Sequence, residues 1–282
     1  MKYLITGATG DVGSRVTELL LAQGERPRVF VRNPDKARQR FADRADVWIG
    51  EIGDFRALAR AMSGIETLFL LTSGPAIPAL DRGAAAAAGE AGVRHIVKLS
   101  SLDVEQGLAI GAWHEQGEAA IRASGIPYTF IRPSGFFSNL LAWAHSIQHE
   151  GVVRSSAASG RRPFMHTDDI AAVSVAALVS GSYRGQSLAL TGPEPLSFAE
   201  ITERIAAALG RKLRFEAIGD DEAGRRFGST GAGAEEVDAH VALWGAIRAG
   251  RLSALTDTVQ QVLGRPPIPF ARWLEENLTA FR

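Results

Sequence analysis

Residues Lys2–Gly13, which read KYLITGATGDVG, decide the fold. The apolar strand Lys2–Thr6 runs directly into a glycine turn that opens a predicted helix over Asp11–Gln23, ended by Gly24. In such a turn the first glycine allows the tight bend, the second lets the backbone approach a pyrophosphate, and the third lets helix and strand pack closely. The helix N-terminus then offers free N–H groups to the phosphates. The residues expected to hold a dinucleotide are Gly7, Ala8, Thr9, Gly10, Asp11, Val12 and Gly13; the alternative is a turn kept for backbone geometry alone.

Further apolar runs continue the pattern set by this strand. They are rich in Val, Ile, Leu and Phe, and the spacing between them leaves room for helices, such as those expected at Asn33-Pro34, around Ala84–Ala88 and over Trp113–Ser124. Near-continuous apolar strands separated by helices predict an α/β fold with a doubly wound parallel Rossmann sheet. The runs are Arg28–Arg32, Asp46–Ile49, Thr67–Leu71, His95–Leu99, Tyr128–Ile131 and, later, Gln186–Leu190.

The rhythm changes after Arg132-Pro133, which predicts a second, smaller lobe. We expect the Rossmann domain to span 1–133 and to be completed by about 163–190. Residues 134–162 and 191–282 would form a mostly helical substrate-binding lobe, with Gly228–Gly233 (GSTGAG) as a hinge. The helices expected outside the first domain are 136–150, one capped by Thr167 or Asp168 and running to Val179, 197–209, 235–249, 255–263 and 269–281.

Composition excludes several classes of function. The chain has 282 residues, no cysteine, and 31 Lys+Arg against 31 Asp+Glu, so disulfides and thiolate chemistry are impossible and no nucleic-acid footprint is expected. No apolar stretch approaches the roughly 20 residues of a membrane span, and the beginning of the chain reads as a strand rather than a signal peptide. The six histidines show no metal-ligand spacing, so no metal is expected. A cytoplasmic protein follows as the expectation. The oligomeric state stays open, with a homodimer as one alternative.

The end of the second strand predicts which nucleotide is bound. A site selective for NAD places a carboxylate there, whereas this chain has Arg32, with Lys36 one turn further on. A guanidinium suits a 2′-phosphate, so NADP(H) is expected in preference to NAD(H), unless Arg32 is an ordinary surface residue. Asp54, beside Phe55, would meet the adenine or cap the next helix. Leu71, Thr72 and Ser73 would line the centre of the cofactor.

Taken together, these residues resemble the NmrA-like branch of the atypical short-chain dehydrogenases/reductases. The likeness covers nearly the whole chain and rests on the order and spacing of short motifs. These are Thr6–Gly10, Val31–Pro34, Gly53-Asp54, Leu99–Ser101, Trp113-His114 with Glu118, Arg132-Pro133 with Phe136 and Asn139, Pro163–Ile170, and Gly264–Pro267. The resemblance implies NADP(H) binding, with Ser100 and Pro133 among the expected cofactor contacts. Members include quinone and azo-dye reductases, redox-sensing regulators without turnover, and tailoring reductases of secondary metabolism.

The chain departs from the family at the position of the catalytic Tyr-x-x-x-Lys. Alignment on Glu118 puts Ile110 at the tyrosine position and His114 at the lysine position, so a phenol-based proton relay is not expected. Transfer of hydride to a quinone or enone needs no such acid and relies on positioning. His114 is then the candidate for proton handling or ribose contact, against a packed structural histidine. Ser101 could orient a substrate carbonyl, or simply cap the next helix.

Aromatic residues sketch a pocket for a flat, largely apolar ligand. The residues expected to contact it are Ile110, Trp113, Phe136, Phe137, Asn139, Trp143, Met165 and His166; Phe136-Phe137 could instead be core. The sequence therefore predicts an NADPH-dependent reductase of a quinone or related planar carbonyl compound. Two alternatives stay open: an NADP(H)-sensing regulatory protein without turnover, and a tailoring ketoreductase or isomerase.

Overall fold

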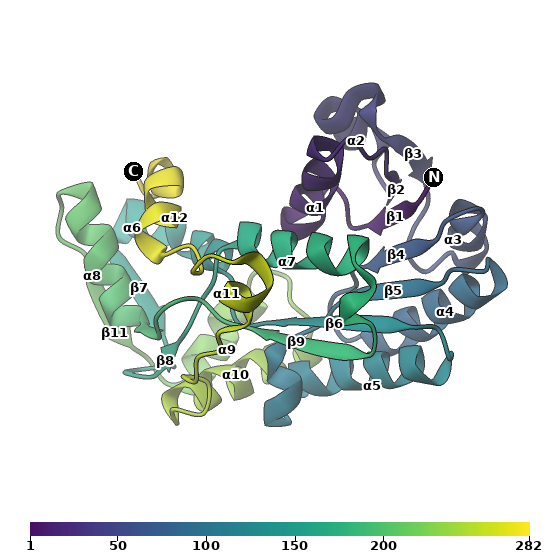
Figure 1. Ribbon diagram of the computed structural model, residues 1–282. Coiled ribbons are helices and arrows are strands. Elements are labelled where there is room, and N and C mark those ends of the chain that lie inside the picture. The colour runs from purple at the N-terminus through teal and green to yellow at the C-terminus, as the bar shows by residue number, and fades with distance from the viewer.

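A computed structural model describes all residues 1–282, and its centre is a seven-stranded parallel sheet (Figure 1). The strand order is β3-β2-β1-β4-β5-β6-β9, so the chain winds outward from β1 in one direction and then from β4 in the other. Every neighbouring pair is parallel, as the predicted doubly wound fold requires. The strands are β1 (Tyr3–Thr6), β2 (Arg28–Val31), β3 (Asp46–Ile49), β4 (Thr67–Leu70), β5 (His95–Leu99), β6 (Tyr128–Pro133) and β9 (Gln186–Leu190).

Helices cover both faces of this sheet, which is why the strands read as continuous apolar runs. On one face lie α1 (Asp11–Ala22), α2 (Pro34–Phe41), α7 (Thr167–Val179) and α11 (Thr258–Leu263). On the other lie α3 (Phe55–Met62), α4 (Ile77–Glu90) and α5 (Ala109–Ala123). The alanine run within α4 packs against the sheet, where small side chains allow a close approach.

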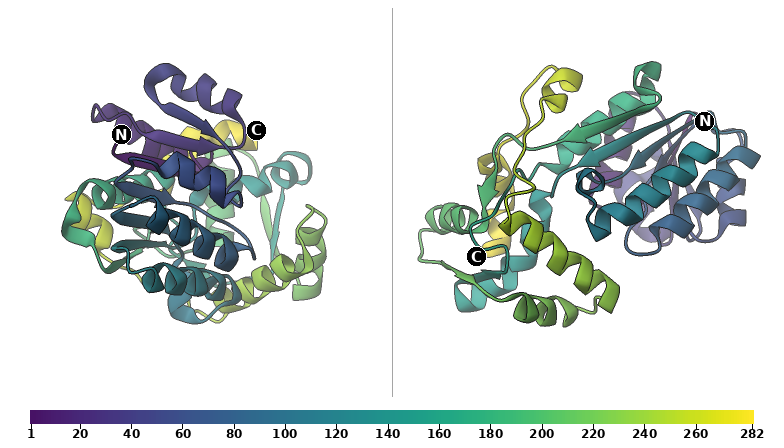
Figure 2. Two further views of the ribbon diagram at one scale, coloured as in Figure 1. Left: turned by 90° about the vertical axis from the view of Figure 1, so that its right-hand side faces the viewer. Right: turned by 90° about the horizontal axis from the view of Figure 1, so that it is seen from below.

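A smaller assembly lies beyond the carboxyl end of the sheet, gathered on the left of Figure 1 and seen from below in Figure 2. Its core surrounds Phe137, Phe270 and Trp273, whose rings lie 5.3–5.8 Å apart. It contains η3 (Phe137–Trp143), α6 (Ala144–Glu150), β7 (Val152–Ser155), β8 (Arg161–Arg162), β10 (Leu196–Ser197), α8 (Phe198–Leu209), β11 (Arg214–Ala217), α9 (Asp220–Gly228), α10 (Ala234–Arg248), α12 (Phe270–Asn277) and η5 (Leu278–Phe281).

Several local features of the smaller assembly differ from the sequence prediction. The stretch 136–150 is a 3₁₀ helix followed by α6, and β11 and α9 were not predicted. Only two of the four residues of β11 are even half-buried, and α9 contains two glycines, so neither has a strong periodic pattern. The segment expected as a helix over 255–263 begins at Thr258, and its Val259 packs into the core around α7. We retain the division near residues 133, 163 and 190 as a proposal. None of the helices combines the length and the apolar character of a membrane span.

Candidate active site

Two adjoining cavities lie where the carboxyl ends of the strands meet the smaller assembly. One, of about 490 Å³, runs from the glycine turn past the end of β4. The other, of about 600 Å³, lies between the end of β5, η3 and α10. Five residues contribute to the lining of both cavities and form what we call the shared wall: Ser100, Ile110, His114, Phe136 and His240.

The glycine turn fits a dinucleotide, and the first cavity begins there. Gly7 has a φ of +64°, and a Cβ on Gly13 would lie 2.2 Å from the Gly7 carbonyl oxygen, so the turn and its contact with α1 need glycine. Gly10 caps α1 without a side chain, which leaves the first-turn N–H groups of the helix open toward the cavity lined by Gly10, Asp11 and Val12. We call this cavity the cofactor cleft.

The other expected cofactor residues fall into two groups. Leu71, Thr72, Ser73 and Ser100 line the cofactor cleft. Arg32 and Lys36 are exposed at the end of β2 and in the first turn of α2, and neither is paired with a carboxylate.

Three residues that the sequence predicted to contact the cofactor do not line the cofactor cleft. Asp54 caps α3, with its Oδ1 accepting from the Ala57 N–H at 3.0 Å. Phe55 packs over Gly83, where a Cβ would come within 2.2 Å of its ring. Pro133 lines the second cavity rather than the cleft.

A buried ion pair lies behind the cleft. The Lys98 ammonium on β5 donates to Thr72 Oγ1 at 2.8 Å and lies 3.4 Å from Asp81 Oδ2, while Thr72 donates to Asp81 Oδ1 at 2.7 Å. Lys98 and Asp81 are completely inaccessible to solvent. Burial lowers the pKa of Lys98 and raises that of Asp81, and their mutual attraction opposes both shifts. The pair thereby fixes Thr72 in the wall of the cleft.

A second buried carboxylate determines what the serine hydroxyls can offer. Ser100 donates to Glu118 Oε1 at 2.6 Å, and Glu118 also accepts two bonds from Arg132 and one from Arg122. The Ser100 proton is thus already used. Ser101 accepts from the Asp103 N–H at 3.1 Å and makes no other bond, so its hydroxyl proton is free to donate into the second cavity.

His114 lies half-buried in the shared wall, with one ring nitrogen removed from water. Its Nδ1 is buried without a hydrogen-bond partner. Burial, together with the nearby Lys98 charge, lowers the pKa of His114 to about 2. The ring is therefore uncharged at neutral pH, and it can contact the cofactor or substrate only as a neutral imidazole.

Some of the expected substrate residues line the second cavity, which we call the substrate cavity. Ile110, Phe136, Asn139 and Trp143 line it, and Trp113 lines the cofactor cleft, with its Nε1 donating to Glu235 at 3.0 Å. The cavity wall contains no tyrosine. Phe137 and Met165 line neither cavity, because both side chains are almost fully buried in the two cores.

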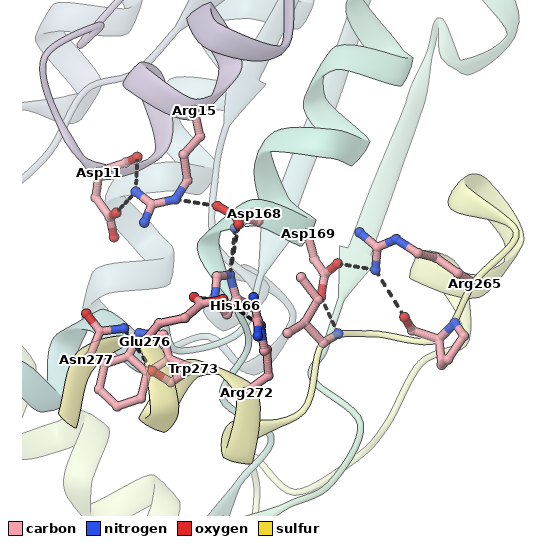
Figure 3. A network of polar contacts seen from close by, with 12 residues as sticks. Asp11, Arg15, His166, Asp168, Asp169, Arg265, Arg272, Trp273, Glu276 and Asn277 are labelled. Carbon is pink, nitrogen blue, oxygen red and sulfur yellow. Dashed lines mark hydrogen bonds and ion pairs between the residues drawn. The ribbon is translucent and has the colours of Figure 1, made fainter. Parts of the chain in front are cut away.

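His166 joins two parts of the chain instead of lining a cavity (Figure 3). Its Nδ1 accepts from the Asp168 N–H at 3.1 Å, so it is His166, and not Thr167 or Asp168, that caps α7. Its Nε2 lies 3.1 Å from Glu276 on α12. Asp168 also binds Arg15 of α1, and Asp169 binds Arg265 near the end of the chain. Both ring nitrogens are occupied, which leaves none for a substrate.

The sequence did not predict that α9 and α10 contribute residues to the site. Phe227, His240, Leu243 and Trp244 line the substrate cavity, and Glu236 lines the cofactor cleft. All five lie more than 80 residues beyond Trp143, the last of the predicted substrate residues that line the substrate cavity, on helices that carry no recognised motif. The only available signal was the aromatic and histidine spacing of His240 and Trp244 on one helical face.

Comparisons with known proteins show the family to which the chain belongs. A family model described as NAD(P)H-binding matches residues 7–180. The chain is 40% identical to a (4-alkanoyl-5-oxo-2,5-dihydrofuran-3-yl)methyl phosphate reductase from Streptomyces griseus and 31% identical to an NAD(P)H azoreductase from Xenophilus azovorans. Each alignment covers 99% of this chain and 98% of the relative. The crystal structure of an NADPH-dependent quinone oxidoreductase from Escherichia coli, complexed with NADPH, has a TM-score of 0.87 at 25% identity and covers 97% of this chain and 99% of its own. The chain therefore belongs to the NAD(P)H-binding family, among its NmrA-like, quinone-oxidoreductase-type reductases.

Proposed function

We propose that this protein uses NADPH to reduce an uncharged, planar, conjugated carbonyl compound, such as a quinone or an enone. The observation that carries the proposal is the shared wall, because it lets a cofactor in the cleft and a flat molecule in the substrate cavity meet at the same five residues. The bound cofactor would supply a hydride. Positioning of the two partners against each other is then the principal task of the protein.

Ser101 is the group we assign to the substrate carbonyl. Its free hydroxyl proton can donate to an oxygen that becomes more negative as hydride arrives, which stabilises the transition state more than the ground state. Ser100 cannot do this while it donates to Glu118, and it offers only oxygen lone pairs to the cavity. Ile110 and Phe136 supply apolar surface for a flat ring.

The charges around the substrate cavity favour a substrate without a phosphate. Arg154 is already paired with Glu150 and Glu216, and Arg162 with Asp103. No arginine in the cavity wall is therefore left without a carboxylate to neutralise a phosphate dianion. The relative from Streptomyces griseus has a name that describes an unsaturated lactone with a phosphate, so this chain would share the conjugated acceptor but not the anionic group.

The first prediction concerns turnover. Purified protein is expected to oxidise NADPH repeatedly, followed by absorbance, with neutral quinones and enones, and at least tenfold less efficiently in kcat/KM with the phosphorylated analogue of an accepted enone. A preference for the phosphorylated compound would overturn the assignment of an uncharged substrate. NADPH binding without consumption by any acceptor would instead favour the cofactor-sensing alternative.

A second prediction tests the preference for NADP(H), which we base on Arg32 and Lys36. The Arg32→Asp substitution should lower the ratio of NADPH to NADH affinity by about tenfold to a hundredfold, because a charge-assisted hydrogen bond to the 2′-phosphate contributes about 1.5–3 kcal/mol. Tryptophan fluorescence titration with each cofactor measures the ratio. Arg94→Asp is the control, since it makes the same charge change beside Glu66 at the opposite end of the strands. An unchanged ratio in Arg32→Asp would remove Arg32 from the site.

A further inference from the structure

Two histidines belong to the shared wall, but they differ in what they can do for a substrate. His114, on α5, is half-buried, and its Nδ1 is buried without a partner. His240, on α10, is half-buried and lines both the cofactor cleft and the substrate cavity. A reduction that delivers hydride to carbon also needs a proton for the oxygen, and Ser101 can orient that oxygen but is too weak an acid to supply one readily. The inference that follows rests on the proposed function.

The tautomer of His240 is set by its own helix. Its Nδ1 lies 2.8 Å from the carbonyl oxygen of Glu236, one turn earlier. A carbonyl only accepts, so Nδ1 carries a hydrogen, and Nε2 is the nitrogen left for the cavity. No protein group hydrogen-bonds to Nε2. The ring is held in place but has one working nitrogen free.

Two aromatic rings lie beside the imidazole of His240. The Phe227 ring centroid lies 4.2 Å away, at 36° to the imidazole plane, and that of Trp244 lies 6.2 Å away. Aromatic faces attract a cation. The charged and titratable groups that share its two cavities are Glu236 on α10, Asp11 on α1, His114 on α5, and the paired Asp103, Arg154 and Arg162.

We propose that His240 delivers the proton to the oxygen of the reduced substrate. In this step a C–H bond forms at the acceptor carbon with the hydride of the reduced nicotinamide, which is thereby oxidised. The electron pair of the acceptor π system moves to the carbonyl oxygen. The Nε2–H bond of the imidazolium then breaks as the O–H bond forms, and the neutral ring takes its next proton from water. In this step Ser101 orients the substrate oxygen and His240 protonates it.

The test compares two histidines with the same local geometry. In His240→Gln, kcat with a quinone accepted by the unaltered protein should fall by about a hundredfold or more, the usual range for loss of a general acid. NADPH affinity, measured by fluorescence without an acceptor, should change far less than kcat, because His240 touches only the border between the cleft and the substrate cavity. His149→Gln is the matched control, because His149 also binds the carbonyl of the residue one turn earlier but is exposed and lines neither cavity. It should retain full activity.

The pH profile separates proton transfer from packing. Turnover of the unaltered protein should decrease above the pKa of one ionising group, and this limb should be absent in His240→Gln but present in Ser101→Ala, which loses only the orienting donor. A second readout needs no turnover. The probe 4-nitrophenol should bind the unaltered protein as its coloured anion, paired with the imidazolium, and should lose this spectral shift in His240→Gln but not in His149→Gln.

The outcomes are distinguishable. Unaltered turnover in His240→Gln, with an unchanged pH limb and an unchanged 4-nitrophenol spectrum, would overturn the role of His240 and leave the proposed reductase intact. Absence of turnover in the unaltered protein would overturn the proposed function, and the role of His240 with it.

Discussion

Acidification from pH 7 to pH 5 should lower the free energy of unfolding by about 2 kcal/mol through His114 and by a similar amount through His95. Burial lowers the pKa of His114 to about 2 and that of His95 to about 4, with Lys98 and Arg184 as the respective nearby charges. In the unfolded chain both rings titrate near 6.5. Between the folded and unfolded values the unfolded state therefore binds more protons, and stability falls as the pH falls.

Urea unfolding at pH 7, 6 and 5 measures this effect. The His114→Leu variant should lose about 2 kcal/mol less than the unaltered protein over this interval, because it removes one of the two protonation differences. The comparison between variants is needed because burial raises the pKa of Asp81, and protonation of that carboxyl works in the opposite direction. His145→Gln, at an exposed position, is the control and should follow the unaltered protein. Parallel profiles for His114→Leu and the unaltered protein would show that His114 titrates normally.

Replacement of Lys98 by methionine should destabilise the fold by about 3–5 kcal/mol, the usual cost of removing one partner of a buried ion pair. The ammonium is fully buried and supports Thr72 and Asp81 together. Without it, the Asp81 carboxyl stays buried with only the Thr72 hydroxyl as a partner. NADPH affinity should fall as well, because Thr72 lines the cofactor cleft.

Urea unfolding and cofactor titration test this prediction with two companions. The double variant Lys98→Met with Asp81→Leu should recover most of the lost stability, since an apolar pair of similar volume replaces a buried ion pair at little cost. Arg94→Met breaks the exposed pair with Glu66 and should change stability by less than about 1 kcal/mol. A loss in Lys98→Met no larger than in Arg94→Met would contradict a supporting role for the buried pair.

Local chemistry explains why the fold was predictable. Most strands of the sheet are short and apolar, and several are followed by a helix with a local start signal, such as Asn33 before Pro34, whose side chain accepts from two N–H groups of α2. The glycine turn is equally local, because the clash that excludes a side chain at Gly13 involves Gly7 only six residues away. Where the hydrophobic periodicity was weak, as in β11 and α9, the sequence did not predict the element.

Features of the candidate site that depend on nearby residues were predictable, and those that depend on distant residues were not. The sequence alone determined the doubly wound sheet, the glycine turn, the open first turn of α1 and a basic end to β2, because each depends on neighbours within a few residues. Only the tertiary structure decided which hydroxyl is free, since Ser100 is occupied by Glu118 18 residues away, and that the His114 ring is uncharged. Desolvation comes from all the elements packed around a ring, so only the folded chain lowers the pKa of His114. The packing of α10 brings His240, more than 120 residues later in the chain, to the same wall.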